Sequence, residues 1–180
     1  MKKNYLFTSE RLGFRNWTES DLKELEIMNS NIEVMEHFPK TLSQKENKEL
    51  FNKLKLHYKK HKYTYFATET LDNKQFVGFI GLAFQEYKTK YTPAVDIGWR
   101  LKKSAWGKGY ATEGAKRCLD FAFNQLNLKT VIATCTKNNY KSENVMKKVG
   151  MEKVGLFKHP LLKEYPKHEV CCCYSISKKT

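Results

Sequence analysis

The stretch from Val95 to Gly114 limits what this chain can fold into more than any other part of its sequence. It reads V-D-I-G-W-R-L, then K-K-S-A, and then W-G-K-G-Y-A-T-E-G. The β-branched and aromatic residues of the first part predict a strand, and the glycines that follow predict a turn. Apolar residues then recur at helical spacing, namely Ala111, Ala115, Cys118, Leu119, Ala122 and Leu126. The stretch therefore predicts a strand, a glycine turn and a helix.

The glycine turn has the features of an anion site. Gly107 and Gly109 permit backbone geometries that expose successive N–H groups where the helix begins, with the positive end of the helix dipole behind them. Two common phosphate-binding motifs do not fit the turn. The dinucleotide motif G-x-G-x-x-G requires glycine at Thr112, and the phosphate loop G-x-x-x-x-G-K-[ST], started at Gly109, requires lysine at Ala115. The turn belongs to neither motif.

The turn resembles the coenzyme-binding signature of the Gcn5-related N-acetyltransferase (GNAT) superfamily, [RQ]-x-x-G-x-[GA]. In that register Gly109 is the central glycine, Ala111 is the small final residue, and Trp106 replaces the usual Arg or Gln. W-G-x-G-Y-A-T-E after I-G-W-R-L is typical of the branch that contains the ribosomal-protein N-terminal acetyltransferases (RimJ/RimL-like). The resemblance implies that the turn binds the pyrophosphate of acetyl-coenzyme A.

The composition is that of a globular protein with a basic surface. With 180 residues, 41% of them hydrophobic and 29% charged, the chain is expected to form a single domain over residues 1–180. The net charge of +14 has two interpretations: a binding surface for nucleic acid, the ribosome or an acidic substrate, or a solvated lysine-rich surface. The lysines are scattered and no arginine-aromatic cluster is present, which favours the second. A nucleic-acid partner is not expected.

The sequence also suggests a compartment. It contains no apolar run of about 18 residues and no leader-like start, so we expect a cytoplasmic protein without a membrane partner. The five cysteines are Cys118, Cys135 and the run Cys171-Cys172-Cys173. They lack the spacing of a zinc site and are expected to be reduced, partly buried thiols. No metal is implied.

Hydrophobic periods and capping residues divide the rest of the chain into helices and strands. Helices are predicted after Thr18, from Ser43 to about His61, and from Asn139 to Gly150. Strands are predicted at residues 12–15, 63–70, 76–84, 94–101, 130–136, 151–157 and 168–176, with 86–92 as a polar connection. This order matches the GNAT superfamily. It implies the α/β GNAT fold, a mixed, mostly antiparallel twisted sheet of about six to seven strands flanked by four helices.

Two further blocks match the superfamily. N-x-x-S-x-x-V-x-x-K-x-G occurs from Asn139 to Gly150, and the His159-Pro160 loop is followed by H-x-V at His168. Asn139 also suits a helix N-cap. Carried over onto matching positions, the resemblance implies that coenzyme binding involves Trp99, Arg100, Leu101, Trp106, Gly107, Lys108, Gly109, Tyr110, Ala111, Thr112, Asn139, Ser142 and Lys148.

Acetyl transfer to an ammonium group requires a base, donors for the oxyanion, and a way to release the thiolate. Many relatives carry a carboxylate base at the position of Asp96, whose alternatives are a solvated strand residue or a partner of Arg100. The resemblance makes Ser142 and Tyr140 candidate acids for the thiolate, although a thiol with a pKa of about 8.5 also leaves unaided. Gly98 is compatible with a strand distortion that exposes N–H donors to the thioester oxygen.

The sequence therefore predicts an acetyl-coenzyme A-dependent N-acetyltransferase in which a primary amine attacks directly in a ternary complex. No cysteine is paired with a base, which argues against a covalent intermediate. The acceptor stays open between a protein N-terminus and a small-molecule amine, with His37, Phe38 and His159 as candidate contacts. The alternative is a basic module on the same fold that binds the coenzyme, the ribosome or nucleic acid without turnover. A monomer or a homodimer is expected.

Overall fold

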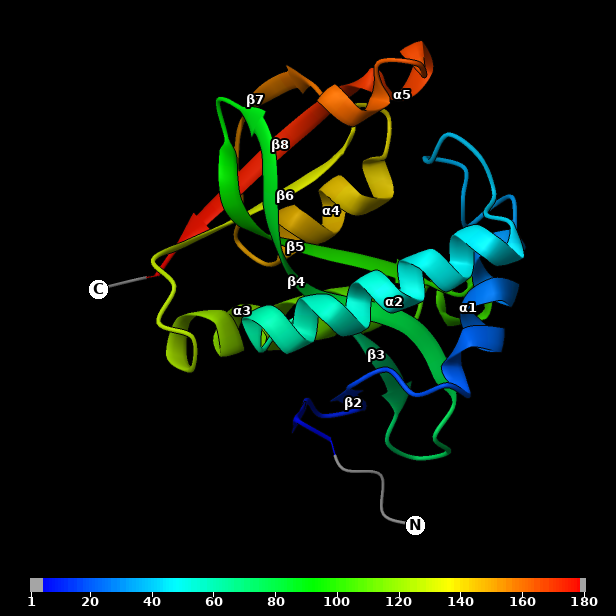
Figure 1. Ribbon diagram of the computed structural model, residues 1–180. Coiled ribbons are helices and arrows are strands. Elements are labelled where there is room, and N and C mark those ends of the chain that lie inside the picture. The colour runs from blue at the N-terminus through cyan, green and yellow to red at the C-terminus, as the bar shows by residue number, and fades with distance from the viewer. Residues whose placement is uncertain (1–4, 179–180) are drawn as a thin grey trace.

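The computed structural model describes residues 5–178, which form an eight-stranded sheet with helices on both faces (Figure 1). The strands are β1 (Phe7–Thr8), β2 (Leu12–Arg15), β3 (Tyr65–Thr70), β4 (Phe76–Thr89), β5 (Thr92–Leu101), β6 (Thr130–Thr136), β7 (Glu152–Lys158) and β8 (Val170–Ser177). The helices are α1 (Asp21–Ser30), α2 (Gln44–His61), α3 (Tyr110–Asn124), α4 (Tyr140–Lys148) and α5 (Pro166–Glu169). No helix in this range is long and apolar enough to cross a membrane.

The sheet consists of two parts that meet at one point. Its strand order is β1-β2-β3-β4-β5-β6-β8-β7, and every neighbouring pair is antiparallel except β5 and β6. β4 and β5 stay in register from the pair Gly78–Leu101 to the pair Gln85–Ala94. In contrast, β5 and β6 have a single pair of opposed residues, Asp96 and Ile132. The two parts of the sheet therefore separate on either side of Asp96.

Each face of the sheet has its own hydrophobic core, as the alternation of side chains along the strands requires. On one face, Ile80 and Leu82 pack with Ala115 and Leu119 of α3. On the other face, α1 and α2 contribute residues such as Phe51, which packs with Trp17 and Phe79. Figure 1 shows α2 crossing in front of the sheet, with α3 behind it. The two faces of β5 thus have different surroundings.

The predicted fold class is confirmed, with slightly more strands than stated and an additional short helix. The extra strand is β1, which pairs with β2, and the extra helix is α5. The predicted cap of α2 is present as a reciprocal capping box between Ser43 and Glu46. The side chain of Asn139 accepts a hydrogen bond from the Ser142 N–H at 3.0 Å and so caps α4.

Two boundaries are corrected at the N-terminal helix and the central hairpin. Thr18 does not cap α1, because the helix begins at Asp21. Instead, the carboxylate of Asp21 accepts hydrogen bonds from the N–H and the hydroxyl of Thr18. Residues 86–92 are not a connection, because β4 continues to Thr89 and β5 begins at Thr92. The Tyr91 hydroxyl donates to the carbonyl of Val154, so packing on β7 extends the hairpin despite its polar sequence.

A third correction concerns the last strand. His168 lies in α5 and not in a strand, and β8 begins at Val170. Pro166 is the first residue of α5, where its fixed φ favours a helical start and its missing N–H costs nothing. His168 therefore lies in the helical turn that Pro166 starts, and not in the extended conformation that the sequence pattern predicts.

Candidate active site

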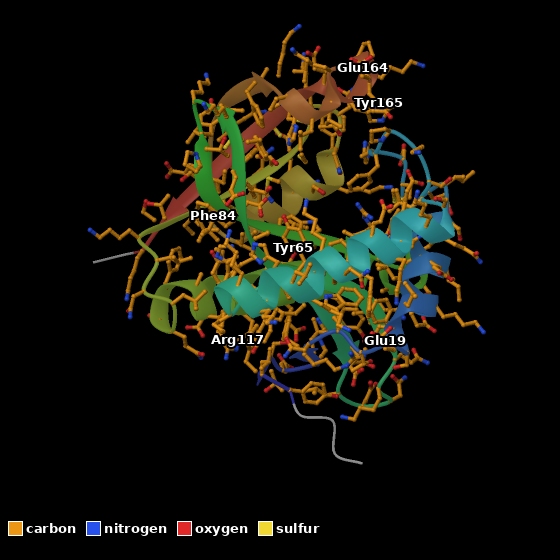
Figure 2. The ribbon with its side chains drawn as sticks, viewed as in Figure 1. Glu19, Tyr65, Phe84, Arg117, Glu164 and Tyr165 are labelled. Atoms are coloured by element: carbon orange, nitrogen blue, oxygen red, sulfur yellow. The ribbon has the colours of Figure 1, made fainter. Side chains whose placement is uncertain are left out.

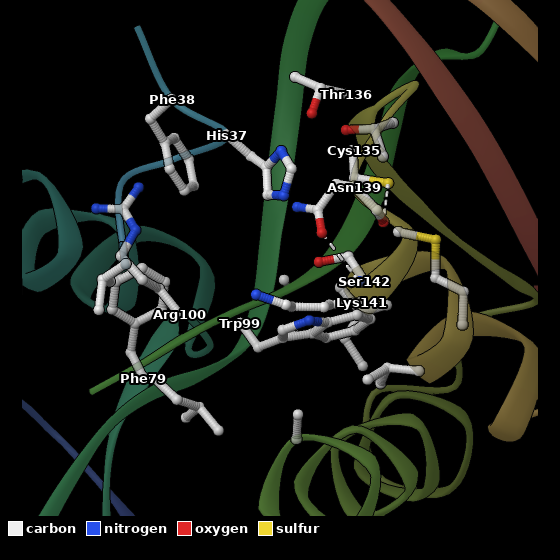
Figure 3. Close-up of a pocket in the computed structure, with 18 of the residues that line it drawn as sticks. His37, Phe38, Phe79, Trp99, Arg100, Cys135, Thr136, Asn139, Lys141 and Ser142 are labelled. Atoms are coloured by element: carbon white, nitrogen blue, oxygen red, sulfur yellow. Dashed lines mark hydrogen bonds between the residues drawn. The ribbon is translucent and has the colours of Figure 1, made fainter. Parts of the chain in front are cut away.

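A cleft of about 710 Å³ opens where β5 and β6 separate (Figure 3). Among the described residues, Asp96 is the only residue of β5 with a partner in β6. The backbone N–H and C=O groups that face β6 beyond Asp96 therefore have no strand partner. Such groups need hydrogen-bond partners. This edge of β5 is suited to an extended ligand that carries amide groups, as the pantetheine arm of coenzyme A does.

The predicted glycine turn forms an open cradle at one end of the cleft. Gly107 and Gly109 have φ values of 75° and 80°, a left-handed conformation that favours glycine. A Cβ added at Gly107 would meet no atom within 4 Å. No side chain caps the N-terminus of α3, so its first N–H groups keep their capacity to donate. The cradle therefore fits a diphosphate, which the helix dipole also favours.

Arg11 and Trp106 hold the cradle from two sides. Arg11 donates from Nη1 to the carbonyl of Lys108 at 3.0 Å and pairs with Glu113 in the first turn of α3. The indole N–H of Trp106 donates to the carbonyl of Leu101 at 3.0 Å, which fixes the turn to the end of β5. Trp106 thus supports the backbone of the turn in this chain.

The N-terminus of α4 lies on the opposite side of the cleft. Because Asn139 Oδ1 accepts from the Ser142 N–H at 3.0 Å, the amide group of Asn139 is held at the cleft surface. Figure 3 shows Asn139 and His37 facing each other across the cleft. The Ser142 hydroxyl makes no hydrogen bond to a described residue. This side of the cleft therefore presents an amide and a hydroxyl that are free to bind a ligand.

Asp96 lies at the point where the strands separate, and only 6% of its surface is exposed. The hydroxyl of Tyr65, near the middle of the molecule in Figure 2, donates to Asp96 Oδ1 at 2.6 Å. Burial raises the pKa of Asp96 from 3.8 to about 6, while hydrogen bonds from Tyr65 and Gln85 act in the opposite direction. The carboxylate is therefore ionised at neutral pH, but it accepts a proton more readily than an exposed aspartate does.

The acceptor contacts expected from the sequence all line the cleft. His37 and Phe38 come from the loop between α1 and α2, and His159 follows β7. The centre of the His159 ring lies 4.4 Å from the centre of the Tyr87 ring. Nδ1 of His159 accepts a hydrogen bond from the Leu161 N–H. Burial lowers the pKa of both His37 and His159, so both rings are neutral at neutral pH.

The cleft brings together most of the residues singled out in the sequence. It is lined by Asp96, Trp99, Arg100, Leu101, Trp106, Gly107, Gly109, Tyr110, Ala111, Thr112, Asn139, Ser142, Lys148, His37, Phe38 and His159. Two of the predicted site residues, Lys108 and Tyr140, are not among the lining residues. Tyr140 is the first residue of α4 and is 67% exposed, because it points away from the core. The structure therefore gives no support to Tyr140 as an acid.

Sequence reasoning missed the aromatic and polar residues behind Asp96. Tyr65, Phe79, Gln85 and Tyr87 all line the cleft. Tyr65 and Phe79 belong to the predicted hairpin, and strand alternation puts them on the same face as Asp96. That alternation is the signal that identifies them. The same signal could not identify Gln85 and Tyr87, because the predicted strand ends at Phe84.

Comparison with known proteins gives the family. The model of the acetyltransferase (GNAT) domain matches residues 11–152. An uncharacterized N-acetyltransferase, YnaD from Bacillus subtilis, is 32% identical over 152 residues, which cover 84% of this chain and 85% of the relative. The chain belongs to the GNAT acetyltransferase family, and acetyl-coenzyme A is the cosubstrate of this fold.

Two solved structures show how far the fold resemblance extends. A spermidine N-acetyltransferase from Vibrio cholerae, in complex with CoA and spermine, is 21% identical with a TM-score of 0.71, covering 92% of this chain and 95% of that chain. RimL, a ribosomal L7/L12 α-N-protein acetyltransferase in complex with coenzyme A, is 17% identical with a TM-score of 0.77, covering 97% and 98%. At these identities the likeness is one of fold. The RimJ/RimL-like branch stays a prediction.

Proposed function

We propose that residues 1–180 form one N-acetyltransferase domain that transfers the acetyl group of acetyl-coenzyme A to a primary amine by direct attack in a ternary complex. The observation that carries the proposal is the environment of Asp96. A buried carboxylate with a pKa of about 6 lies in the same cleft as the open glycine cradle. A carboxylate of this kind is suited to remove a proton from an ammonium group.

The coenzyme is held by backbone groups in this proposal. The diphosphate lies on the N–H groups between Gly107 and Thr112, and the pantetheine arm runs along the unpaired edge of β5 from Ile97 to Leu101. Asn139 contributes its amide from α4. Both contact surfaces are main-chain or short polar groups, which makes binding depend on the shape of the turn.

Asp96 accepts the proton that the ammonium group must lose, either directly or through one water. The hydrogen bond from Tyr65 holds the carboxylate in place, and burial raises the pKa of Tyr65 well above its ordinary value, so that its hydroxyl remains a donor. The freed amine forms a bond to the thioester carbon. Unpaired N–H groups of β5 stabilise the negative charge that develops on the thioester oxygen.

The final step breaks the carbon–sulfur bond and releases coenzyme A. The thiolate takes a proton from Ser142, whose hydroxyl lines the cleft, or directly from water. The five cysteines need no part in this scheme. Four of them are buried and Cys135 is partly buried, and burial raises the pKa of Cys118 and Cys171.

The acceptor class is not fixed by the fold. One structural neighbour is a spermidine N-acetyltransferase and another acetylates a ribosomal protein, so both a small amine and a protein N-terminus are compatible with this architecture. The cytoplasmic location, and the choice between a monomer and a homodimer, remain predictions.

Calorimetric titration followed by a turnover assay tests the proposal. We expect acetyl-coenzyme A to bind one-to-one, desulfo-coenzyme A to bind comparably, and adenosine diphosphate to bind much more weakly because it lacks the pantetheine arm. Thiol release should then accompany acetylation of at least one member of an amine and peptide panel. Absence of binding would contradict the cradle. Binding with an intact thioester across the whole panel would favour a module without turnover.

A further inference from the structure

Arg100 is a cationic side chain in the cleft that the proposed acetyl transfer does not use. It lies four residues after Asp96 on β5, so both side chains are on the face of the sheet covered by α1 and α2. Its Cζ atom is 3.9 Å from the centre of the Phe38 ring and 5.3 Å from that of Phe79. Figure 3 shows the guanidinium beside these two rings.

The guanidinium has few hydrogen-bond partners. Nη1 donates to Asn29 Oδ1 at 2.8 Å. Nε is buried and has no partner, and Nη2 has none among the described residues. Within residues 5–178 no carboxylate lies within ion-pair distance of Arg100. Burial of this unbalanced charge lowers the pKa of Arg100 to about 10, so the site would gain from an anion.

Arg15 shows what this chain does with an arginine that has a structural role. It is 6% exposed, and it pairs with Asp21 at 2.7 Å and with Glu69 at 2.8 Å. The two carboxylates raise its pKa. Two carboxylates therefore compensate the charge of Arg15, whereas within residues 5–178 Arg100 contacts one amide oxygen and two aromatic rings and no carboxylate. This contrast points to a counter-ion for Arg100 from outside the chain.

The protein holds Arg100 in a fixed position. Asn29 Nδ2 donates to Asn47 Oδ1 at 2.7 Å, which turns the amide oxygen of Asn29 toward the guanidinium. Asn47 in turn donates to the carbonyls of Leu42 and Ser43. Asn29 and Asn47 are 0% and 1% exposed. This buried chain of amides orients the cation without neutralising it, as preorganised recognition requires.

The acidic residues near the cleft do not serve as the missing counter-ion. Glu33 and Glu36 line the same cleft, but their carboxylates are 2.7 Å from Lys103 and 3.9 Å from Lys141, respectively. The coenzyme does not supply the charge either, because its pyrophosphate is assigned to the cradle between Gly107 and Thr112 and its pantetheine arm has no carboxylate. The remaining source is the acceptor.

We propose that Arg100 binds a carboxylate carried by the acceptor, so that the substrate class is a small amino acid-like amine whose amino group faces Asp96. This inference rests on the proposed acetyl transfer. The Cα atoms of residues four apart on a strand are about 13 Å from each other. Because both side chains extend into the cleft, the amine and the carboxylate of the acceptor are separated by several bonds.

The test compares acceptors in matched pairs. Each ω-amino acid, from β-alanine to 6-aminohexanoate, is assayed beside its carboxamide, which has the same chain length and amino group but no carboxylate charge. A charge-assisted hydrogen bond to guanidinium predicts kcat/KM about 10- to 100-fold higher for the acid than for the amide at the best chain length. A ratio near one at every length would overturn the assignment of Arg100.

Variants separate recognition from structure. Arg100→Met should bring the acid-to-amide ratio toward one, and Arg100→Lys, which keeps the charge, should restore part of it. Arg117→Met is the matched control, since Arg117 contacts Thr8 and Asp120 outside the cleft, and it should leave the ratio unchanged. Melting temperature and coenzyme affinity are recorded for each variant. An unchanged ratio in Arg100→Met, or a loss confined to stability, would show that Arg100 is structural.

Failure of this inference and failure of acetyl transfer look different. Acetylation of acids and amides at equal rates would remove the carboxylate site and leave the enzyme activity standing. An intact thioester with all acceptors, including uncharged alkylamines and peptides, would overturn the transfer reaction itself.

Discussion

Replacing Asp96 with asparagine is the most direct test of the proposed base. The substitution keeps the shape of the side chain. It also keeps an oxygen that can accept the hydrogen bond from the Tyr65 hydroxyl, which lies 2.6 Å from Oδ1 of Asp96 in the wild-type protein. It removes the group that accepts the proton. General base catalysis contributes roughly 10²- to 10⁴-fold, so kcat/KM at pH 7 should fall by about 100-fold or more.

The pH dependence identifies the cause of this loss. In the wild-type protein, kcat/KM for an amine with a pKa of about 10 should rise through pH 6 as Asp96 loses its proton, and then level off. The asparagine variant reacts only with free amine, whose fraction grows about tenfold per pH unit. A deficit of about 100-fold at pH 7 should therefore nearly disappear at pH 9.

The same variant should be more stable than the wild-type protein at neutral pH. Because folding raises the pKa of Asp96 from 3.8 to about 6, the protonated form is favoured in the folded state. The stability from this group is fully present below pH 3.8 and is lost as the pH rises through 6. The complete loss corresponds to about 3 kcal/mol as an upper bound. Urea denaturation of both proteins between pH 4 and pH 8 measures how much of this loss of stability the asparagine variant avoids.

The assay is thiol release from acetyl-coenzyme A between pH 5.5 and 9.5, with Tyr65→Phe as the companion variant. The Tyr65 hydrogen bond lowers the pKa of Asp96, so its removal should move the rising limb of the profile to higher pH. If the Asp96→Asn profile runs parallel to that of the wild-type protein, Asp96 is not the base.

Three further predictions concern the cradle, a helix cap and a buried ion cluster. Gly109→Trp should abolish coenzyme binding in calorimetry, because the indole would fill the space that the phosphates need. The control is Gly150→Trp, at another left-handed glycine with φ 85°, which should leave the coenzyme affinity unchanged. Equal coenzyme affinities of the two variants would contradict the cradle. Asn139→Ala should lower the free energy of unfolding by about 1 kcal/mol and weaken coenzyme binding, while Ser43→Ala should cost similar stability alone. Arg15→Met removes the cation that the buried carboxylates of Asp21 and Glu69 share and should cost about 3 to 5 kcal/mol in urea denaturation; a loss below about 1 kcal/mol would refute this.

The order of strands and helices could be predicted because local signals carry it. The Ser43 capping box and the left-handed glycines after α4 and before α3 act within a few residues of their own positions. The boundaries that failed depend on distant contacts. The end of β4 is extended by Tyr91, whose hydroxyl reaches Val154 on β7, and no local pattern contains that contact.

The environment of a residue was harder to predict than its place on a strand. The sequence identifies Asp96 as an acid among β-branched and aromatic neighbours, but its pKa depends on burial and on Tyr65, which lies far from it in the chain. Similarly, one predicted alternative paired Asp96 with Arg100. The structure shows no such ion pair. The carboxylate of Asp96 accepts a hydrogen bond from Tyr65, and the guanidinium of Arg100 donates one to Asn29.

The two halves of the site differ in how the chain encodes them, and this difference separates their functions. In the proposed site, the coenzyme contacts the backbone edge of β5 and two short runs, 106–112 and 139–148, that lie at the starts of α3 and α4. The acceptor side combines the loop before α2 with β3, β4, β5 and the segment after β7. Substitutions at Phe38 or Arg100 can therefore alter the acceptor pocket without touching the glycine turn. A change of Gly109 should weaken every acceptor equally through the coenzyme, whereas a change of Arg100 should reorder the acceptors among themselves.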